Sequence, residues 1–220
     1  MKKYGCILFD LDGTLTDPAL GITNSFMYSL KKYGITVSDR SELYKVIGPP
    51  LVNSFHEYYG IPEEECMNAV RFYREYYTTK GMFENYVYDG IPECLERLKA
   101  SGRLVLTATS KPEPYAAEII RHFGIDGYFD FIAGASLDET RTGKDDVIRY
   151  ALSSNGITDL SSVLMVGDRK YDVIGAKKIG VDSMGVLYGY GTKAELEEAC
   201  PDYIASSPKE IADMILSADK

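Results

Sequence analysis

The sequence is poor in the residues that mark zinc sites, disulfide frameworks and membrane spans. Its two histidines, His56 and His122, lack an acid or a cysteine at a useful spacing, and its four cysteines are scattered without a CxxC pair. These patterns argue against a zinc site or a disulfide framework and favour a reducing compartment. No apolar run approaches membrane-spanning length, and the run after Met1 is too short for a signal peptide. We therefore expect a cytoplasmic protein with no membrane partner.

Positive charge is also scarce. The 220 residues contain 24 Lys and Arg against 33 Asp and Glu, which gives a net charge of −9. No basic stripe offsets this charge, so the composition argues against a nucleic-acid partner. An anionic substrate would need a local positive site, made by lysines or by a bound metal ion. With 45% apolar residues, the chain has the composition of a globular protein with a sizeable core.

Acidic residues follow the first apolar run of the chain. Cys6 to Phe9 has the length of a buried strand; it stops at Asp10, and Gly13 indicates a sharp turn soon afterwards. Asp10 and Asp12 therefore lie where a core strand ends, which in open α/β sheets is the edge that binds ligands. Two close carboxylates repel each other, so such a site needs a cation, a shared proton or both. The pair predicts a catalytic site.

The remaining patterns divide the chain into two parts. Apolar residues at helical spacing extend from about residue 17 to residue 86 without a strand signal, and strands alternate with helices from residue 89 onward. The fold class predicted is α/β, with a doubly wound, Rossmann-like parallel sheet and an inserted all-helical cap domain. We expect the core to contain residues 1–15 plus 87–220, and the cap residues 16–86.

Polar side chains also follow two later strands of the predicted sheet. Thr109 and Ser110 end one strand, Asp168 ends another, and Lys144 opens a helix that could face the same edge. Taken alone, the hydroxyls are ordinary turn residues and the lysine an ordinary surface residue. Together, acids for a hard divalent cation, hydroxyls and amides for oxyanions, and one lysine suit a phosphate ester and magnesium.

Four motifs in this order resemble those of the haloacid dehalogenase-like superfamily. They are DLDGTLTD at 10–17, the TS of TATSKP at 109–110, the lysine of TGKDD at 144, and GDRKYD at 167–172. The helical insertion after the first motif is similar to that superfamily's C1-type cap. GPPL at 48–51, GASLD at 134–138 and LYGYG at 187–191 resemble, more narrowly, phosphoglycolate phosphatase-like proteins and a bacterial branch of them described as 5′-nucleotidases.

The resemblance implies a role for each matching residue. Asp10 would be the nucleophile that carries the phosphoryl group, and Asp12 the acid and then base. Mg²⁺ would be bound by Asp10, the carbonyl of Asp12, and Asp168, with Asp172 supporting the metal or Lys144. Lys144 would neutralise charge between phosphate and nucleophile. Thr109 and the amide of Ser110 would hold phosphoryl oxygens, although many relatives have asparagine where this chain has serine. Further candidates for contact with phosphate or substrate are Gly13, Lys111, Gly48 and Pro49, with a solvated surface position equally open for Lys111.

The function that the resemblance implies is a magnesium-dependent phosphatase for small phosphomonoesters, acting through an aspartyl-phosphate. A 5′-nucleotidase and a phosphoglycolate phosphatase are the two specific forms we expect. A sugar phosphomutase of the same superfamily is the alternative, followed by a non-catalytic binding protein on this fold. A dehalogenase is disfavoured because Asp12 supplies an acid that carbon–halogen chemistry does not need. The expected partner is a small phosphorylated metabolite, and the expected state is a monomer or homodimer.

Overall fold

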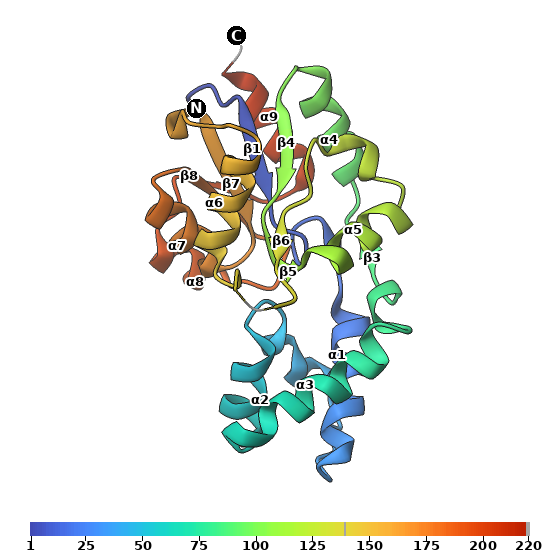
Figure 1. Cartoon of the computed structure of the whole chain (residues 1–220). Helices are drawn as coiled ribbons and strands as arrows, with labels where there is room; N and C mark the ends of the chain where they lie inside the picture. The colour runs from blue at the N-terminus through green and yellow to red at the C-terminus, as the bar shows by residue number, and fades with distance from the viewer. Residues whose placement is uncertain (139, 219–220) are drawn as a thin grey trace. The chain divides into compact units, whose positions relative to one another are not determined.

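The computed structural model describes residues 1–138 and 140–218, which form two compact units (Figure 1). The core unit contains residues 1–16 and the described residues from 87 onward, and the helical unit is Asp17–Tyr86. Thr16 falls in the core unit because its amide donates to the carbonyl of Leu11 and its carbonyl accepts from the amide of Gly13. The division therefore comes one residue later than the expected boundary.

The core unit is built on a five-stranded parallel sheet in which the first strand lies between two others. The order is β4 (Leu104–Thr107), β1 (Cys6–Phe9), β7 (Val163–Gly167), β8 (Asp182–Val186) and β9 (Tyr203–Ala205). Cys6 is opposite Leu104 on one side and Val163 on the other. This order confirms the predicted doubly wound parallel sheet, and it brings the carboxyl ends of β1, β4 and β7 to one edge.

A second, two-stranded parallel sheet consists of β5 (Thr109–Pro112) and β6 (Gly134–Ala135). A single residue, Ala108, separates β5 from the end of β4, and an isolated bridge pairs Leu106 of β4 with Phe131. The apolar residues at 131–133 predict a strand from the sequence, but the structure has only this bridge at Phe131, with β6 directly after Ala133. β9 and the short helix α8 (Lys193–Ala199) have no counterpart in the sequence-based prediction.

Helices cover the sheet of the core unit. α6 (Lys144–Ser154) packs against α7 (Lys170–Ile179), and both contribute to a buried cluster with alternate residues of the sheet, among them Cys6, Leu8 and Met165. Ile7 and Phe9 alternate with these residues and point to the opposite face. α4 (Ile91–Ala100) and α9 (Pro208–Ser217) pack against each other, α4 also against β4 and α9 against β9. The other elements of the unit are α5 (Glu113–His122) and two short 3₁₀ helices, η3 (Asp126–Tyr128) and η4 (Leu160–Ser162).

The helical unit contains three α-helices and two 3₁₀ segments: α1 (Ala19–Lys32), η1 (Arg40–Val46), α2 (Leu51–Tyr59), α3 (Glu63–Tyr77) and η2 (Gly81–Phe83). α3 packs against both α1 and α2. Phe26 is fully buried, with its ring centroid 4.6 Å from that of Phe55 and 5.3 Å from that of Tyr73. The short strands β2 (Thr16–Asp17) and β3 (Tyr86–Val87) form a two-stranded sheet where the chain enters and leaves this unit. The predicted helical insertion is therefore confirmed.

Within the described residues, none of the helices has both the length and the apolar character that a membrane span requires.

Candidate active site

The loop after β1 is wound around the carbonyl of Leu11. That oxygen accepts the amides of Thr14, Leu15 and Thr16 at 3.2, 2.9 and 3.0 Å. Gly13 has a φ of 85°, in the left-handed region that favours glycine. The amide of Asp10 still donates to Val166 in the neighbouring strand, at 2.9 Å, so the loop begins at the edge of the sheet. This coil keeps both Asp10 and Asp12 at the carboxyl end of β1.

Lys144 is the first residue of α6 and is almost completely buried. Its Nζ lies 2.8 Å from Oδ1 of Asp10 and 2.8 Å from Oδ1 of Asp172, and it donates to the carbonyl of Ala108 at 3.0 Å. Three acceptors match the three protons of an ammonium group. Burial alone lowers the pKa of Lys144, but the charges of Asp10 and Asp172 outweigh it and hold that pKa above its ordinary value. Lys144 is therefore a buried positive charge beside Asp10.

Asp168 follows the last residue of β7 and is fully buried. Its Oδ2 accepts the amide of Tyr190 at 2.7 Å, and its Oδ1 accepts the hydroxyl of Thr14 at 3.4 Å. Burial, followed by the negative charges of Asp172 and Asp10, raises the pKa of Asp168 to about 8. A carboxyl group with this pKa lies where positive charge is missing.

The three buried carboxylates suit a divalent cation. Asp10, Asp168 and Asp172 each offer an oxygen, and these oxygens all lie within 4.8 Å of one another. Oδ1 of Asp172 is paired with Lys144, and its Oδ2 accepts the amide of Arg169 at 3.0 Å. Mg²⁺ prefers oxygen ligands and takes few protein carboxylates because it keeps several waters. The donor set therefore fits Mg²⁺, and the contacts of Asp172 agree with its expected supporting position.

Asp12 forms an ion pair with Lys111 in β5. Nζ of Lys111 lies 2.7 Å from Oδ2 of Asp12, and the side chains are 6% and 15% exposed. The solvated surface position left open for Lys111 is thus excluded. Oδ1 of Asp12 is buried and has no hydrogen-bond partner among the described residues. Burial raises the pKa of Asp12, although the charge of Lys111 opposes the shift.

The predicted phosphate-binding residues Thr109 and Ser110 begin β5. Thr109 is buried, donates its amide to the carbonyl of Ala133 at 3.2 Å, and accepts the amide of Lys111 on its Oγ1, also at 3.2 Å. Ser110 is exposed. Both follow Ala108, whose carbonyl binds Lys144, so the chain brings them to the edge that holds Asp10.

Gly48 and Pro49 belong to the helical unit, in the turn between η1 and α2. Gly48 is exposed with a φ of 102°, and Pro49 is half-buried. Contact of either residue with a substrate stays a prediction.

Sequence reasoning missed the loop at 187–191 as a part of the site. In addition to the Tyr190 amide on Asp168, the hydroxyl of Tyr188 donates to the carbonyl of Thr14 at 2.9 Å. A Cβ on Gly189 would lie 2.3 Å from the carbonyl oxygen of Gly13 and 2.4 Å from Cβ of Asp168. The sequence feature that could have predicted this loop is the pair Gly189 and Gly191, which follows a predicted strand at the edge of the sheet that holds the acidic residues.

The side chain of Arg169, which follows Asp168, forms an ion pair with Glu195. Its Nε lies 2.9 Å from Oε1 of Glu195 in α8, and the two side chains are 12% and 19% exposed. Glu195 also accepts the amide of Lys170 at 3.0 Å. Arg169 therefore joins the start of α7 to α8. This role could not be predicted from its position next to Asp168 in the sequence.

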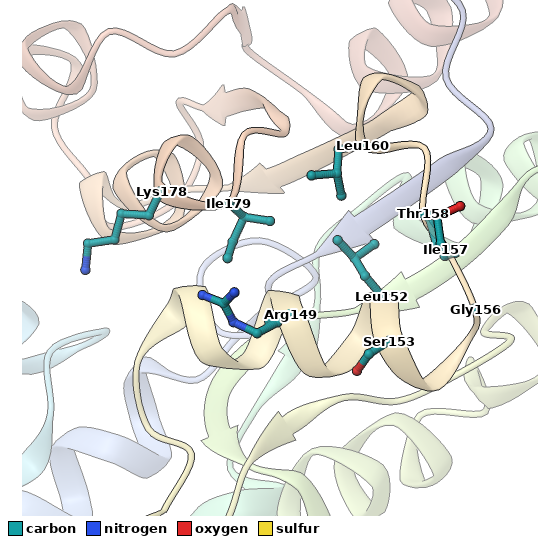
Figure 2. Close-up of a pocket in the computed structure, with 9 residues that line it drawn as sticks. All are labelled: Arg149, Leu152, Ser153, Gly156, Ile157, Thr158, Leu160, Lys178 and Ile179. Carbon is teal, nitrogen blue, oxygen red and sulfur yellow. The ribbon is translucent and has the colours of Figure 1, made fainter.

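A hollow of about 360 Å³ lies elsewhere on the core unit, between the C-terminal parts of α6 and α7 (Figure 2). Its apolar lining comes from Leu152 of α6, Ile157 of the following loop, Leu160 of η4 and Ile179 of α7, with Arg149 at its side. None of the carboxylates described above lines it. Since α6 begins at Lys144, this hollow is at the opposite end of the helix from the site.

The family model for haloacid dehalogenase-like hydrolases matches residues 7–186. The 5′-nucleotidase of Pseudomonas aeruginosa is 46% identical, over 91% of this chain and 90% of its own length. The crystal structure of a predicted phosphatase from Clostridium acetobutylicum is 50% identical, with a TM-score of 0.94, over 98% of this chain and 100% of that one. The tyrosine-protein kinase PtkA of Mycobacterium tuberculosis is 41% identical over 84% of this chain, which spans 62% of the kinase's length.

These matches cover the motifs of the site as well as the fold. The family model includes Asp10, Asp12, Lys144 and Asp168, and the structural match includes both units of the chain. The chain therefore belongs to the haloacid dehalogenase-like hydrolases, as an enzyme of the phosphatase type.

Proposed function

We propose that this chain is a magnesium-dependent phosphatase that hydrolyses small phosphomonoesters through an aspartyl-phosphate on Asp10. The observation that carries the proposal is the buried contact of Lys144 with both Asp10 and Asp172, beside Asp168. It supports the proposal because the Asp10 carboxylate contacts a buried positive charge and lies close to oxygens of Asp168 and Asp172. Such a site stabilises the charge of a phosphoryl group in transfer, which is the main requirement of that chemistry.

In the first step, a carboxylate oxygen of Asp10 attacks phosphorus and the bond from phosphorus to the ester oxygen breaks. Asp12 in its acid form gives its proton to that oxygen, so the product leaves as an alcohol. Lys144 orients Asp10 and reduces its repulsion of the anionic substrate. Thr109 and the amide of Ser110 donate to phosphoryl oxygens. Bound Mg²⁺ supplies positive charge for the phosphoryl oxygens and the carboxylates.

In the second step, water attacks the phosphorus of the aspartyl-phosphate. Asp12, now a carboxylate, takes a proton from the water, and the bond between Asp10 and phosphorus breaks. Inorganic phosphate leaves, Asp10 is again a carboxylate and Asp12 again an acid. The net reaction consumes one ester and one water and yields one alcohol and one phosphate.

The nucleophile is the first part to test. With 4-nitrophenyl phosphate and Mg²⁺, we expect the wild-type protein to release nitrophenol and free phosphate. Asp10→Asn keeps the shape of the side chain but removes the attacking charge, so turnover should fall at least about a thousand-fold. Asp12→Asn should also be severe, and phosphorylated protein should accumulate because water is no longer activated. Mass spectrometry of acid-quenched protein would detect it.

Asp146→Asn is the matched control for these variants, because Asp146 is an exposed acid in the first turn of α6, close to Lys144 in sequence. It should leave activity unchanged. Near wild-type turnover by Asp10→Asn would rule out covalent catalysis at this residue.

The natural substrate is the finer part of the proposal. The P. aeruginosa relative is named a 5′-nucleotidase, and a Vibrio parahaemolyticus relative that is 26% identical is named a phosphoglycolate phosphatase. The higher identity of the first supports a nucleoside monophosphate as the substrate. A panel of nucleoside monophosphates, phosphoglycolate and sugar phosphates, compared by kcat/KM, tests this. We propose that the turn containing Gly48 and Pro49 selects among them, since the residues of the core site act on any phosphate ester.

Transfer to an acceptor other than water is the competing outcome. A sugar phosphomutase would return an isomerised sugar phosphate without net release of phosphate. The relative PtkA is named a kinase, but that protein extends well beyond the region matched by this chain. Incubation with sugar phosphates, followed by separate measurement of free phosphate and of isomers, distinguishes hydrolysis from isomerisation.

A further inference from the structure

The contact with Lys111 leaves the two carboxylate oxygens of Asp12 in different environments. Oδ2 faces the ammonium group at 2.7 Å, whereas Oδ1 is buried with no hydrogen-bond partner among the described residues. A buried oxygen without a partner is costly in free energy, so it marks a place where a partner is expected to bind. Of the two carboxylate oxygens of Asp12, Oδ1 is the one that lacks such a partner among the described residues.

The backbone of Lys111 is held on two sides. Its amide donates to the hydroxyl of Thr109 at 3.2 Å. Its carbonyl oxygen lies against Gly134 of β6, where an added Cβ would be only 2.6 Å away. Residue 111 is thus a fixed point of the core unit from which the side chain reaches Asp12.

The two buried lysines of the site have separate partners. Lys144 contacts Asp10 and Asp172, and Lys111 contacts Asp12. The terminal torsion of an aspartate side chain is broad and roughly two-fold, so nothing intrinsic decides which oxygen faces a substrate. A charge-assisted hydrogen bond to one oxygen removes that freedom.

We propose that Lys111 is a positioning residue for Asp12: by holding Oδ2, it presents Oδ1 as the oxygen that gives and takes the proton during phosphoryl transfer. This inference rests on the proposed function, because it assigns an atom to a step of that mechanism. It differs from a direct contact of Lys111 with the phosphate, which would make Lys111 act on all phosphate esters alike.

Leaving groups of different basicity separate the two roles. A proton donor matters greatly when an alkoxide must leave and little when 4-nitrophenolate leaves, because the latter is stable without the proton. The value of kcat/KM reports the steps up to release of the alcohol. Lys111→Met should therefore lower kcat/KM about a hundred-fold for glycerol 2-phosphate and less than about five-fold for 4-nitrophenyl phosphate, with KM little changed. Lys111→Arg, which keeps the charge, should recover part of the loss.

A double-mutant cycle provides the decisive comparison. Asp12→Asn should show the same dependence on the leaving group, and adding Lys111→Met to Asp12→Asn should change kcat/KM less than about three-fold, because the group that Lys111 positions is already lost. Where Lys111→Met alone unfolds by leaving the Asp12 charge buried and unpaired, the double variant lacks that charge and the comparison with Asp12→Asn still decides.

Three results would overturn the proposal. They are an equal loss on both substrates, a loss that persists in the Asp12→Asn background, and wild-type kinetics of Lys111→Met. Failure of the proposed function would instead be seen in the wild-type protein, as absence of magnesium-dependent phosphate release. The two failures are therefore distinguishable.

Discussion

The backbone at position 189 can lie close to Asp168 because residue 189 is a glycine. An added Cβ there would lie 2.4 Å from Cβ of Asp168 and 2.5 Å from its Oδ2. Neither the backbone of Gly13 nor the fully buried Asp168 can move away without disturbing the carboxylates around them. The space at residue 189 therefore fixes where Oδ2 of Asp168, a proposed metal ligand, lies.

Gly189→Ala should consequently damage the metal site. We expect the Mg²⁺ concentration for half-maximal activity to rise at least about ten-fold, since misplaced ligands typically cost that much affinity. Overpacking should lower the free energy of unfolding by about 1–3 kcal/mol. A magnesium titration of activity, together with urea unfolding, measures both effects.

Gly127→Ala is the matched control, because nothing lies within 4 Å of a Cβ added at residue 127. An unchanged magnesium requirement in Gly189→Ala would contradict the assignment of Asp168 to the metal.

At the scale of residues, the sequence predicted only some of the side chains that meet at the site. Asp10, Asp12 and Asp168 end apolar runs, and a motif at a strand end is visible in a linear sequence. The partners of these residues are not visible, because the Lys111–Asp12 pair joins β5 to the loop after β1. The amide of Tyr190 is a backbone donor and leaves no side-chain signature at all.

At the scale of elements, Glu195 joins two helices that follow different strands. It accepts from Nε of Arg169 at 2.9 Å and from the amide of Lys170 at 3.0 Å, which ties α8 to the start of α7. Burial alone raises the pKa of Glu195, but these hydrogen bonds outweigh it and hold that pKa below its ordinary value. Since α7 also contains Asp172, the joint supports one side of the site.

The stabilisation from Glu195 should depend on pH in a defined direction. A carboxylate with a lowered folded-state pKa stabilises above its unfolded value, about 4.3, and loses this contribution as the pH falls through the folded value. Glu195→Gln should thus lower the free energy of unfolding by about 1 kcal/mol at pH 7. The difference from wild type should shrink below about pH 4. Urea unfolding of both proteins from pH 7 to pH 3 tests this.

Glu197→Gln serves as the comparison, because Glu197 pairs with Lys193 on the exposed side of α8 and should change stability little. A difference between wild type and Glu195→Gln that stays constant down to pH 3 would show that the charge of Glu195 has no part in the joint.

Long elements could be predicted from the sequence and short ones could not. The helices from α1 to α6 show sustained helical spacing, so their existence follows from local pattern. β9 has three residues and α8 seven. Segments of that length contain too few periods to distinguish them from loops, and they form because β8 and α7 offer them a surface. The same reason explains why β6 begins directly after the strand expected at residues 131–133.

For the whole molecule, we expect the buried carboxylates to make stability depend on the proposed metal ion. Asp10, Asp168 and Asp172 are buried with oxygens within 4.8 Å of one another, a spacing that the unfolded chain does not retain. A ligand that binds only the folded state stabilises it, by about 2.7 kcal/mol at a hundred times its Kd. We expect saturating Mg²⁺ to raise the Tm by about 5–10 °C.

Differential scanning fluorimetry with and without Mg²⁺ measures this shift independently of activity. EDTA should reverse it, and Asp168→Asn should abolish it, whereas Asp146→Asn should retain it. Activity that survives thorough chelation, or an equal Tm shift in Asp168→Asn, would refute the metal site.

The position of β1 also determines the order in which the protein can fold during synthesis. β1 pairs on one side with the strand that starts at Leu104 and on the other with the strand that starts at Val163. When β1 leaves the ribosome, neither neighbour has been made, while Asp17–Tyr86 is completed before either of them. The helical unit can thus form on the nascent chain first, and the Cys6–Phe9 segment must remain unpaired until Leu104–Thr107 has been translated. An apolar segment exposed for that long is a natural binding site for chaperones.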